Sequence, residues 1–355
     1  MNEKYSNIDS QEDDDRLRSQ LKQLPKVELH RHLEGSVRIE TLIDIAEEHS
    51  VEMPEYEVET LRPFVQMMPQ EHRSFQNFLA KFRTIRQFFL SEAIIRRITR
   101  EVIEDAANDN IKYMELRFTP QALNSLIKSN VQDVVTWVCE ATRQAQEDFD
   151  IQVKLIVSMN RHESHEIGRK ALDAALEHRD QGVVAVDLAG REDEFPASLF
   201  RDIFKVALAE QLHVTIHAGE WGGAESVWDA VGNLGAERVG HGIRVLEDPK
   251  LVGVLVEKGI VLEVCPTSNY HSGVVNELKD HPLNILHQNG ILVTLNTDDP
   301  LISDLNLTDE LYNVMTQLQL TFDDVKAYTM RAVESSFLPK DEQIVLADKF
   351  RSWLY

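Results

Sequence analysis

A histidine and a glutamate stand three residues apart at the end of a short apolar run. Residues 214–223 read V-T-I-H-A-G-E-W-G-G, in which β-branched residues typical of a buried strand precede His217 and Glu220. Gly219 permits a turn between the two side chains. An imidazole and a carboxylate at the tip of a buried strand suggest a metal ligand beside an acid–base group. A core histidine capped by a loop glutamate fits this stretch alone equally well.

A second histidine pair lies near the N-terminus, in the run K-V-E-L-H-R-H-L-E-G-S at residues 26–36. If this run is a strand, His30 and His32 point to the same face, and one metal ion could accept both. The pair alone is weak evidence, because roughly 0.5 such pairs arise by chance among so many histidines. Whether these histidines form a site therefore depends on the strands and helices in which they lie.

Strand-like and helical segments alternate regularly along the chain. After the strand that holds His30, further strands are expected at residues 113–120, 153–162, 183–192, 214–217, 238–245, 259–269 and 290–300, each followed by a helical pattern. Eight such units predict an α/β fold, a (β/α)8 TIM barrel with a parallel sheet. We expect a single catalytic domain at residues 25–355, with a helical tail from Asp309 to Tyr355.

The predicted barrel carries two additions. Residues 1–24 are polar and acidic, and we expect a loose arm that ends in a short helix. Residues 36–110 form a helical insertion between the first two strands, with segments at 39–49, 74–89 and 92–108. Phe75, Phe78, Leu79 and Phe82 make one apolar stripe in this insertion. The stripe is either ordinary core or a lid that gives a flat ligand a dry wall.

Polar residues recur where the predicted strands end, which is where such barrels place their active sites. A scatter of unrelated core histidines would not fall at the same end of strand after strand. The residues at these ends are His30, His32, Arg117, Arg161, His162, Asp187, Gly190, His217, Glu220, His241, Ser268, Asn269, Asp298 and Asp299.

Sorting these groups by chemistry predicts a catalytic zinc site. His30, His32, His217 and Asp298 supply three imidazoles and one carboxylate, which leaves an open position for water. Zinc would lower the pKa of that water towards about 7. Glu220 then stands nearby as a proton donor or acceptor, with His241 as a second base. Asp299 is free to accept a hydrogen bond from the substrate.

Two other kinds of metal site are excluded. Deaminases of the cytidine type need a P-C-x-x-C pair, and neither Cys139 nor Cys265 stands in such a motif. Two-metal H-x-H barrels commonly bridge their ions with a lysine on strand four, where this chain reads V-V-A-V-D-L-A-G-R. We therefore expect one zinc ion per chain.

The amino-acid composition limits the classes of molecule that the protein is expected to bind. The formal charge of −23, with 60 acidic against 37 basic residues, disfavours nucleic acid and anionic membranes. Two cysteines provide no disulfide framework. The N-terminus has no apolar signal region, and no run approaches the roughly 20 apolar residues that span a bilayer. We expect a cytoplasmic protein with a small-molecule substrate, and the oligomeric state is left open.

Six motifs occur in the order P-K-V-E-L-H-R-H-L-E-G-S, D-L-A-G-R-E, H-A-G-E, R-V-G-H-G-I, C-P-T-S-N and N-T-D-D-P. Together they resemble the adenosine deaminase family of the amidohydrolase superfamily, from about Pro25 to Pro339. The resemblance implies hydrolytic deamination at C6 of a purine, releasing ammonia and leaving inosine. It also implies site roles as follows: His30, His32, His217 and Asp298 as zinc ligands, Glu220 as proton donor to purine N1, His241 as the base that orients the hydroxide, Asp299 as the acceptor facing N7, and the Gly190 amide as donor to N3.

Three positions depart from the family pattern. Glu34 stands where adenosine-specific members usually have aspartate, at the position that reaches the ribose 5′-hydroxyl. Arg191 and Trp221 replace an acidic residue and a small or aliphatic one. Adenine deaminases of the family share the glutamate, but they tend to have H-A-G-E-E-G and S-D-D-P, which this chain lacks.

The substrate expectation follows from these matches and departures. We expect His32, Glu34, Gly190 and Asp299 to contact a purine nucleoside, with adenosine and 2′-deoxyadenosine preferred. The alternatives are adenine or a 5′-modified adenosine, such as methylthioadenosine or aminodeoxyfutalosine, for which Arg191 would supply a counter-charge to an anionic tail. A metal-stabilised barrel that binds a nucleoside without turnover is a remote alternative.

Overall fold

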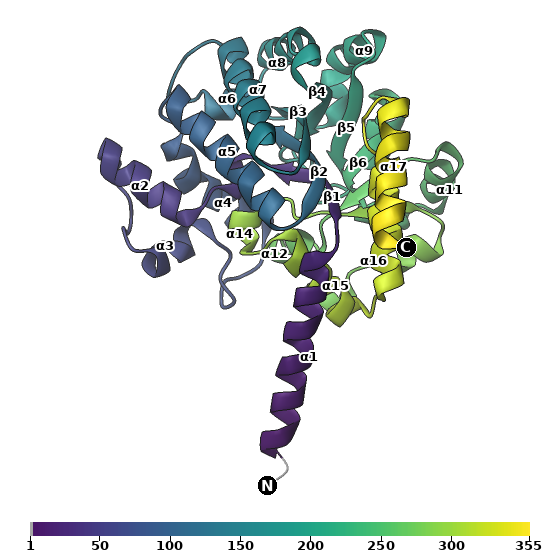
Figure 1. Cartoon of the computed structure of the whole chain (residues 1–355). Coiled ribbons are helices and arrows are strands. Elements are labelled where there is room, and N and C mark those ends of the chain that lie inside the picture. The colour runs from purple at the N-terminus through teal and green to yellow at the C-terminus, as the bar shows by residue number, and fades with distance from the viewer. Residues whose placement is uncertain (1–2) are drawn as a thin grey trace.

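The protein folds as a nearly closed barrel of parallel strands (Figure 1). The structure is a computed structural model, which describes the backbone of residues 3–355 and side chains from residue 12 onward. Within this range the sheet runs in chain order, and its strands are β1 Lys26–His32, β2 Ile111–Phe118, β3 Gln152–Asn160, β4 Val183–Ala189, β5 His213–Ala218, β6 Arg238–His241, β7 Val261–Val264 and β8 Leu292–Leu295. The predicted (β/α)8 barrel is therefore confirmed.

Helices surround the sheet and extend beyond it. The N-terminal helix α1 is Glu3–Gln23, and the insertion between β1 and β2 contains α2 Ile39–His49, α3 Val58–Val65, α4 Phe75–Ile85 and α5 Glu92–Asn108. Between later strands lie α6 Pro120–Leu123, α7 Val131–Asp148, α8 His165–Glu177, α9 Arg201–Ala209, α10 Ala224–Asn233, α11 Pro249–Lys258, α12 Pro266–His271 and α13 Leu283–Gln288. The tail after β8 contains α14 Pro300–Ser303, α15 Leu307–Leu318, α16 Phe322–Glu334 and α17 Lys340–Leu354.

The N-terminal arm differs from the expectation of a loose segment with a short helix. Residues Glu3–Gln23 form one helix of 21 residues that projects from the barrel (Figure 1). Its C-terminal part is anchored, because Leu21 is fully buried and Arg18 pairs with Asp309. The Arg18 guanidinium also lies over the ring of Tyr312, 3.7 Å from its centre. The residues of α15 that make these contacts are far from α1 in the sequence, so the local polar pattern could not predict them.

The strand boundaries also differ from the prediction at the C-terminal ends. The expected strand at 259–269 stops at Val264, because Pro266 begins the short helix α12. The expected strand at 290–300 stops at Leu295, and Asp298 then adopts a left-handed φ of 67°. Helix α3 in the insertion was not predicted. The polar strand ends are thus loops, which aim their side chains over the barrel.

The barrel closes between its first and last strands through residues of the predicted site. The His32 amide donates to the Asp298 carbonyl over 2.8 Å, and the Asp298 amide donates to the His30 carbonyl over 3.0 Å. An isolated parallel bridge joins Arg31 to Asp298. These bonds hold His30, His32 and Asp298 side by side.

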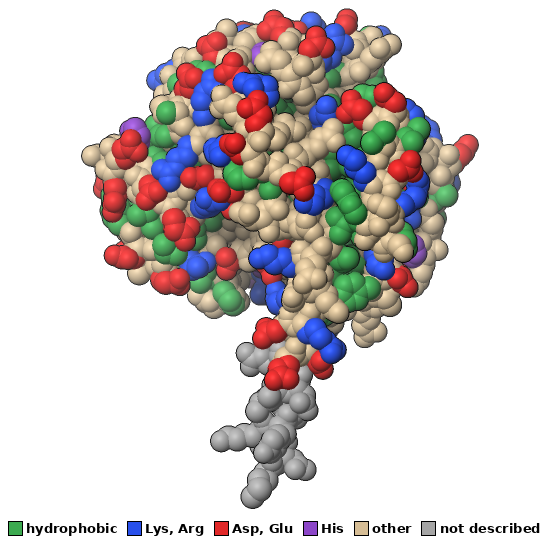
Figure 2. Space-filling model, viewed as in Figure 1, with side chains coloured by type: hydrophobic (Ala, Val, Ile, Leu, Met, Phe, Trp, Pro, Cys, Tyr) green, Lys and Arg blue, Asp and Glu red, His purple; other side chains and the backbone are tan. Residues whose placement is uncertain are grey.

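The surface carries charged side chains of both signs. On the face that Figure 2 shows, acidic and basic side chains are interspersed, and hydrophobic side chains are scattered among them. Across the part of the chain that the structure describes, no helix combines the length and the apolar character needed to cross a membrane.

We expect helix α17 to contribute strongly to stability through Phe350. This fully buried ring packs in a cluster with residues of β1, β2 and α16. Phe350→Ala should lower the free energy of unfolding by about 3–5 kcal/mol, because it leaves a cavity. Ile344→Ala, at a half-exposed position of the same helix, should change it by less than about 0.5 kcal/mol. Chemical denaturation measures both, and equal losses would contradict the packing.

Candidate active site

The loops at the C-terminal ends of the strands surround a cavity of about 360 Å³. Eight of the nine predicted site residues line it, and the ninth, His30, is fully buried beside them. The eight are His32, Glu34, Gly190, His217, Glu220, His241, Asp298 and Asp299. Arg117 and Arg161, also predicted at strand ends, are buried behind the cavity.

Imidazole and carboxylate groups converge at the floor of the cavity. Oδ1 of Asp298 lies 3.1 Å from His30 Nε2 and 3.3 Å from His32 Nε2. His32 Nε2 is 3.2 Å from His217 Nε2. Possible ligand atoms of His30, His217, His241 and Asp298 also lie within 4.8 Å of one another. This geometry brings together the predicted set and adds His241 as a fifth neighbour.

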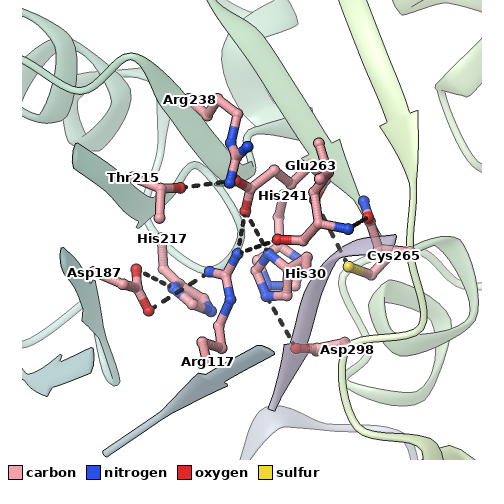
Figure 3. A network of polar contacts seen from close by, with 12 residues as sticks. His30, Arg117, Asp187, Thr215, His217, Arg238, His241, Glu263, Cys265 and Asp298 are labelled. Carbon is pink, nitrogen blue, oxygen red and sulfur yellow. Dashed lines mark hydrogen bonds and ion pairs between the residues drawn. The ribbon is translucent and has the colours of Figure 1, made fainter. Parts of the chain in front are cut away.

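The hydrogen bonds of His30 and His217 suit metal ligation. His30 Nδ1 donates to Glu263 over 2.8 Å, and His217 Nδ1 donates to Asp187 over 2.9 Å (Figure 3). A carboxylate only accepts, so each ring carries its hydrogen on Nδ1 and exposes a lone pair at Nε2. The Nε2 atom of His30 is buried and has no hydrogen-bond partner. An unpartnered nitrogen aimed at two other imidazoles and a carboxylate fits a metal ion.

The charge of Glu263 is balanced by a buried network behind the site (Figure 3). Besides His30, it accepts hydrogen bonds from Arg117 over 2.6 Å, Arg238 over 2.7 Å and Thr215 over 3.0 Å. Burial alone would raise the pKa of Glu263, but Arg117 and Arg238 hold it well below the usual range. The carboxylate is therefore ionised and fixes the ring of His30.

Glu192 holds the turn that carries Glu220. Its carboxylate accepts hydrogen bonds from the amides of Gly219 over 2.8 Å, Glu220 over 2.6 Å and Trp221, and from the Ser226 hydroxyl over 2.6 Å. Three consecutive amides on one carboxylate fix the backbone as a small anion-binding nest. The side chain of Glu220 is thus positioned by a residue from the loop after β4.

Glu220 lies in surroundings that favour its neutral form. Burial, together with the charges of Asp298 and Glu192, raises the pKa of Glu220 well above its usual value. Its Oε1 atom accepts hydrogen bonds from Ser272 over 3.2 Å and Asn269 over 3.4 Å, and its Oε2 atom lies 3.5 Å from His241 Nε2. A neutral carboxyl group at this place can donate a proton to a ligand.

Two other carboxyl groups of the cavity lining each have a buried oxygen without a hydrogen-bond partner. Glu34 accepts from the Thr119 amide over 2.7 Å, while its second oxygen is buried without a partner. Oδ1 of Asp299 is likewise unpaired. Burial raises the pKa of Glu34 to about 6, and burial with the charge of Asp298 raises that of Asp299 well above its usual value. A Cβ at Gly35 would fall 1.7 Å from Oδ1 of Asp299, so glycine makes room for this carboxyl group.

Backbone strain marks two of the site residues. His241 and Asp298 have φ angles of 60° and 67°, in the left-handed region that non-glycine residues seldom occupy. Such conformations cost free energy and persist where the surroundings enforce them. Gly190, with a φ of 93°, meets a similar need without a side chain.

The insertion forms one wall of the cavity. Phe78, Leu79 and Phe82 of α4 line it, and Phe78 is also buried in the main core. Phe75 stacks on Trp221 with ring centres 5.4 Å apart. The Arg191 guanidinium lies 5.0 Å from the centre of the Phe75 ring and pairs with Asp193 and Glu194. The stripe is therefore both core and cavity wall.

Several supporting residues had no predicted role. Glu263 was detectable as a charge within the apolar run V-L-E-V, and Glu192 as the end of D-L-A-G-R-E. Asn269 was expected at a strand end, and it contacts Glu220 and His241 without lining the cavity. Ser272 and His281 carried no local signal, because their partners are distant in sequence.

We expect Asp187→Asn to weaken metal binding by about 10–100-fold, the usual effect of losing a charged partner behind a histidine ligand. Asparagine keeps an acceptor for His217 Nδ1 but removes the charge. Competition with a chromophoric chelator measures the affinity. Asp193→Asn, at an exposed position where the carboxylate pairs with Arg191, is the control and should bind metal normally. An unchanged affinity for Asp187→Asn would contradict the role of His217.

Comparisons with known proteins identify the family of the chain. A family model described as adenosine deaminase covers residues 25–353. An adenosine deaminase of Clostridium perfringens (strain 13 / Type A) is 37% identical over 319 residues, which cover 90% of this chain and 95% of the relative. This identity and the family model place the chain among enzymes that hydrolyse carbon–nitrogen bonds.

Solved structures of related enzymes have the same fold. Adenine deaminase from Arthrobacter aurescens has a TM-score of 0.85 at 29% identity, covering 93% of this chain and 99% of its own. A zinc-bound amidohydrolase from Burkholderia ambifaria has a TM-score of 0.83 at 25% identity, covering 95% and 94%. Arabidopsis ADAL complexed with IMP has a TM-score of 0.82 at 26% identity, covering 94% and 97%. The chain belongs to the adenosine deaminase family.

Proposed function

We propose that this enzyme is a zinc-dependent deaminase of adenosine and 2′-deoxyadenosine, which it converts to inosine and 2′-deoxyinosine with release of ammonia. One observation carries the proposal. Three imidazoles and a carboxylate converge beside a buried, neutral-favouring Glu220 in a cavity that also holds unpaired oxygens of Glu34 and Asp299. Metal ligands, proton donor and ligand-binding groups thus share one site.

His30, His32, His217 and Asp298 would hold one zinc ion per chain. The unpartnered Nε2 of His30 and the zinc bound in the Burkholderia relative support this assignment. When bound, zinc would act as a Lewis acid and make hydroxide available near neutral pH. As a zinc ligand, Asp298 would also serve catalysis. Its second oxygen accepts a hydrogen bond from the Ser268 hydroxyl over 2.6 Å, which fixes the orientation of the carboxylate.

Glu220 acts as the proton donor to purine N1. Attack at C6 places negative charge on N1, and a proton delivered there stabilises the adduct. The raised pKa keeps the Glu220 carboxyl neutral for this transfer. Glu192 positions the group, because it holds the amides on both sides of Glu220.

The purine ring is recognised at N7 and N3. Purine N7 has a lone pair and no hydrogen, so its partner must donate. The raised pKa of Asp299 favours the neutral carboxyl, which reverses the expected direction of this hydrogen bond: Asp299 donates and N7 accepts. The Gly190 amide, at the cavity wall, donates to N3.

Glu34 reads the sugar. Its unpaired oxygen accepts a hydrogen bond from the ribose 5′-hydroxyl. A site built around a hydroxyl group discriminates strongly against ligands that lack it. Adenine is the second candidate substrate, because an adenine deaminase shares this fold and adenine deaminases resemble this chain at Glu34. Arg191 already pairs with Asp193 and Glu194, which argues against its use for an anionic substrate tail.

We expect Glu220→Gln to retain about one zinc ion per chain while kcat falls by ~10² or more, because glutamine cannot deliver a proton. Metal analysis and steady-state kinetics on adenosine measure the two effects. His217→Ala, in contrast, should lose both metal and activity. Near-normal turnover by Glu220→Gln would mean that another group protonates N1.

The pH profile should report the same group. Because the pKa of Glu220 is raised, its neutral form persists above the ordinary carboxyl range, and activity is lost only as the pH rises through the raised pKa. The wild-type enzyme should therefore show a step in the alkaline limb of kcat that is absent from Glu220→Gln, whose remaining alkaline limb would belong to the neutral Asp299 carboxyl group. An alkaline limb that is identical in both enzymes would contradict the assignment.

We expect adenosine and 2′-deoxyadenosine to have the highest kcat/KM, with adenine far lower because it lacks the 5′-hydroxyl. Adenosine 5′-phosphate should also be poor, since its phosphate would meet the Glu34 carboxyl. Comparison with adenine, methylthioadenosine and aminodeoxyfutalosine measures the preference. A tenfold higher kcat/KM for any of these three would overturn the substrate and leave the deaminase chemistry in place. Glu34→Gln should lower the adenosine-to-adenine ratio.

A further inference from the structure

A chain of buried hydrogen bonds runs from helix α13 to His241. It passes through His281 and Asn269, neither of which lines the cavity. Asn269 is fully buried, and His241 and His281 are almost so. In such surroundings each polar atom depends on its protein partner, so the direction of each bond can be worked out.

The direction is set at the His281 end. The backbone amide of Leu283 donates to His281 Nδ1 over 3.1 Å, and a backbone N–H can only donate. His281 Nδ1 therefore has no hydrogen. Burial lowers the pKa of His281 to about 3, so the ring is neutral and its one hydrogen sits on Nε2.

The amide of Asn269 passes this direction on. Its Oδ1 lies 3.2 Å from His281 Nε2 and accepts that hydrogen. Its Nδ2 then faces His241 Nδ1 at 3.1 Å and Glu220 Oε1 at 3.4 Å, one N–H for each. If the amide were flipped, its Nδ2 would face the Nε2–H of His281, donor against donor. Its Oδ1 would face Oε1 of Glu220, acceptor against acceptor. Only one orientation satisfies all three neighbours.

We infer that His281 and Asn269 hold His241 as the tautomer that carries its hydrogen on Nε2. His241 Nδ1 accepts from Asn269, so it has no hydrogen of its own. The Nε2–H then points toward the cavity, where Glu220 Oε2 lies 3.5 Å away. His281 and Asn269 are positioning residues, because they act only through His241.

This arrangement is the opposite of that at His30 and His217. Those rings donate from Nδ1 to carboxylates and present lone pairs at Nε2. His241 presents a hydrogen instead, so it neither ligates the metal nor accepts a proton at Nε2 in this tautomer. It donates a hydrogen bond to the attacking oxygen. The role in the reaction rests on the proposed function, whereas the tautomer does not.

The test is the nitrogen spectrum of the zinc-loaded enzyme labelled with ¹⁵N-histidine. Two-bond ¹H–¹⁵N correlations distinguish the two tautomers, and the His241 signals are assigned as those missing from His241→Gln. We expect wild-type His241 to show hydrogen on Nε2. Hydrogen on Nδ1 in the wild-type enzyme would overturn the inference without any further variant.

A near-isosteric substitution at Asn269 should reverse the hydrogen bond between residue 269 and His241 Nδ1. When ionised, the carboxylate of Asn269→Asp can only accept, so at a pH above the pKa of this carboxyl group His241 should switch its hydrogen to Nδ1, with unchanged zinc content and at least a tenfold lower kcat. His281→Gln keeps a donor for Asn269 and should retain the wild-type tautomer. Ser272→Ala, the control, removes another partner of Glu220 and should not move the His241 signals. An Nε2–H tautomer in Asn269→Asp would contradict the relay.

The proposed function and the relay can fail separately. If the expected tautomer is found but no 6-aminopurine is deaminated, the relay stands and the function falls. If adenosine is deaminated while His241 carries its hydrogen on Nδ1, the function stands and the relay falls.

Discussion

The site depends on burying one ionised carboxylate, Glu263, in the middle of the barrel. A buried charge is tolerated only when it is fully paired and hydrogen-bonded, and Arg117, Arg238, His30 and Thr215 supply these partners. The network continues outward, because Arg238 also pairs with Glu115, whose other oxygen accepts from the Phe337 amide. The orientation of the His30 ring is thus tied to the segment between α16 and α17. Removing Arg117 or Arg238 would leave this buried carboxylate with a single guanidinium partner.

The hydrogen-bond partner of Nδ1 determines which tautomer each histidine of the site adopts. A carboxylate behind Nδ1 makes His30 and His217 present lone pairs, while an amide donor behind Nδ1 makes His241 present a hydrogen. Rings that lie within about 5 Å of one another therefore serve different purposes. Distance alone groups all of them as ligands, and only the direction of the hydrogen bonds separates them.

The features that could be predicted from the sequence are those that local patterns encode. Apolar, β-branched runs located the strands, and the recurrence of polar residues at their ends located the site, because barrel topology brings these ends together. Residues whose importance depends on a distant partner were not predictable. Glu192 acts on a turn 27 residues away, and His281 acts on His241 through Asn269. The strand ends were overextended, because left-handed residues such as Asp298 look like any aspartate in a sequence.

The seam between β1 and β8 has a consequence for how the protein is made. The His30 and His32 side chains emerge from the ribosome before Asp298, which follows them in the sequence and lies beside them at the seam. This group of side chains is therefore incomplete until Asp298 has been synthesised, and contacts of such long sequence separation form late and slowly. Chains that stop before Asp298 lack the seam, so they cannot bring these side chains together. The order of synthesis thereby delays assembly of the site until the residues that close the barrel have been made.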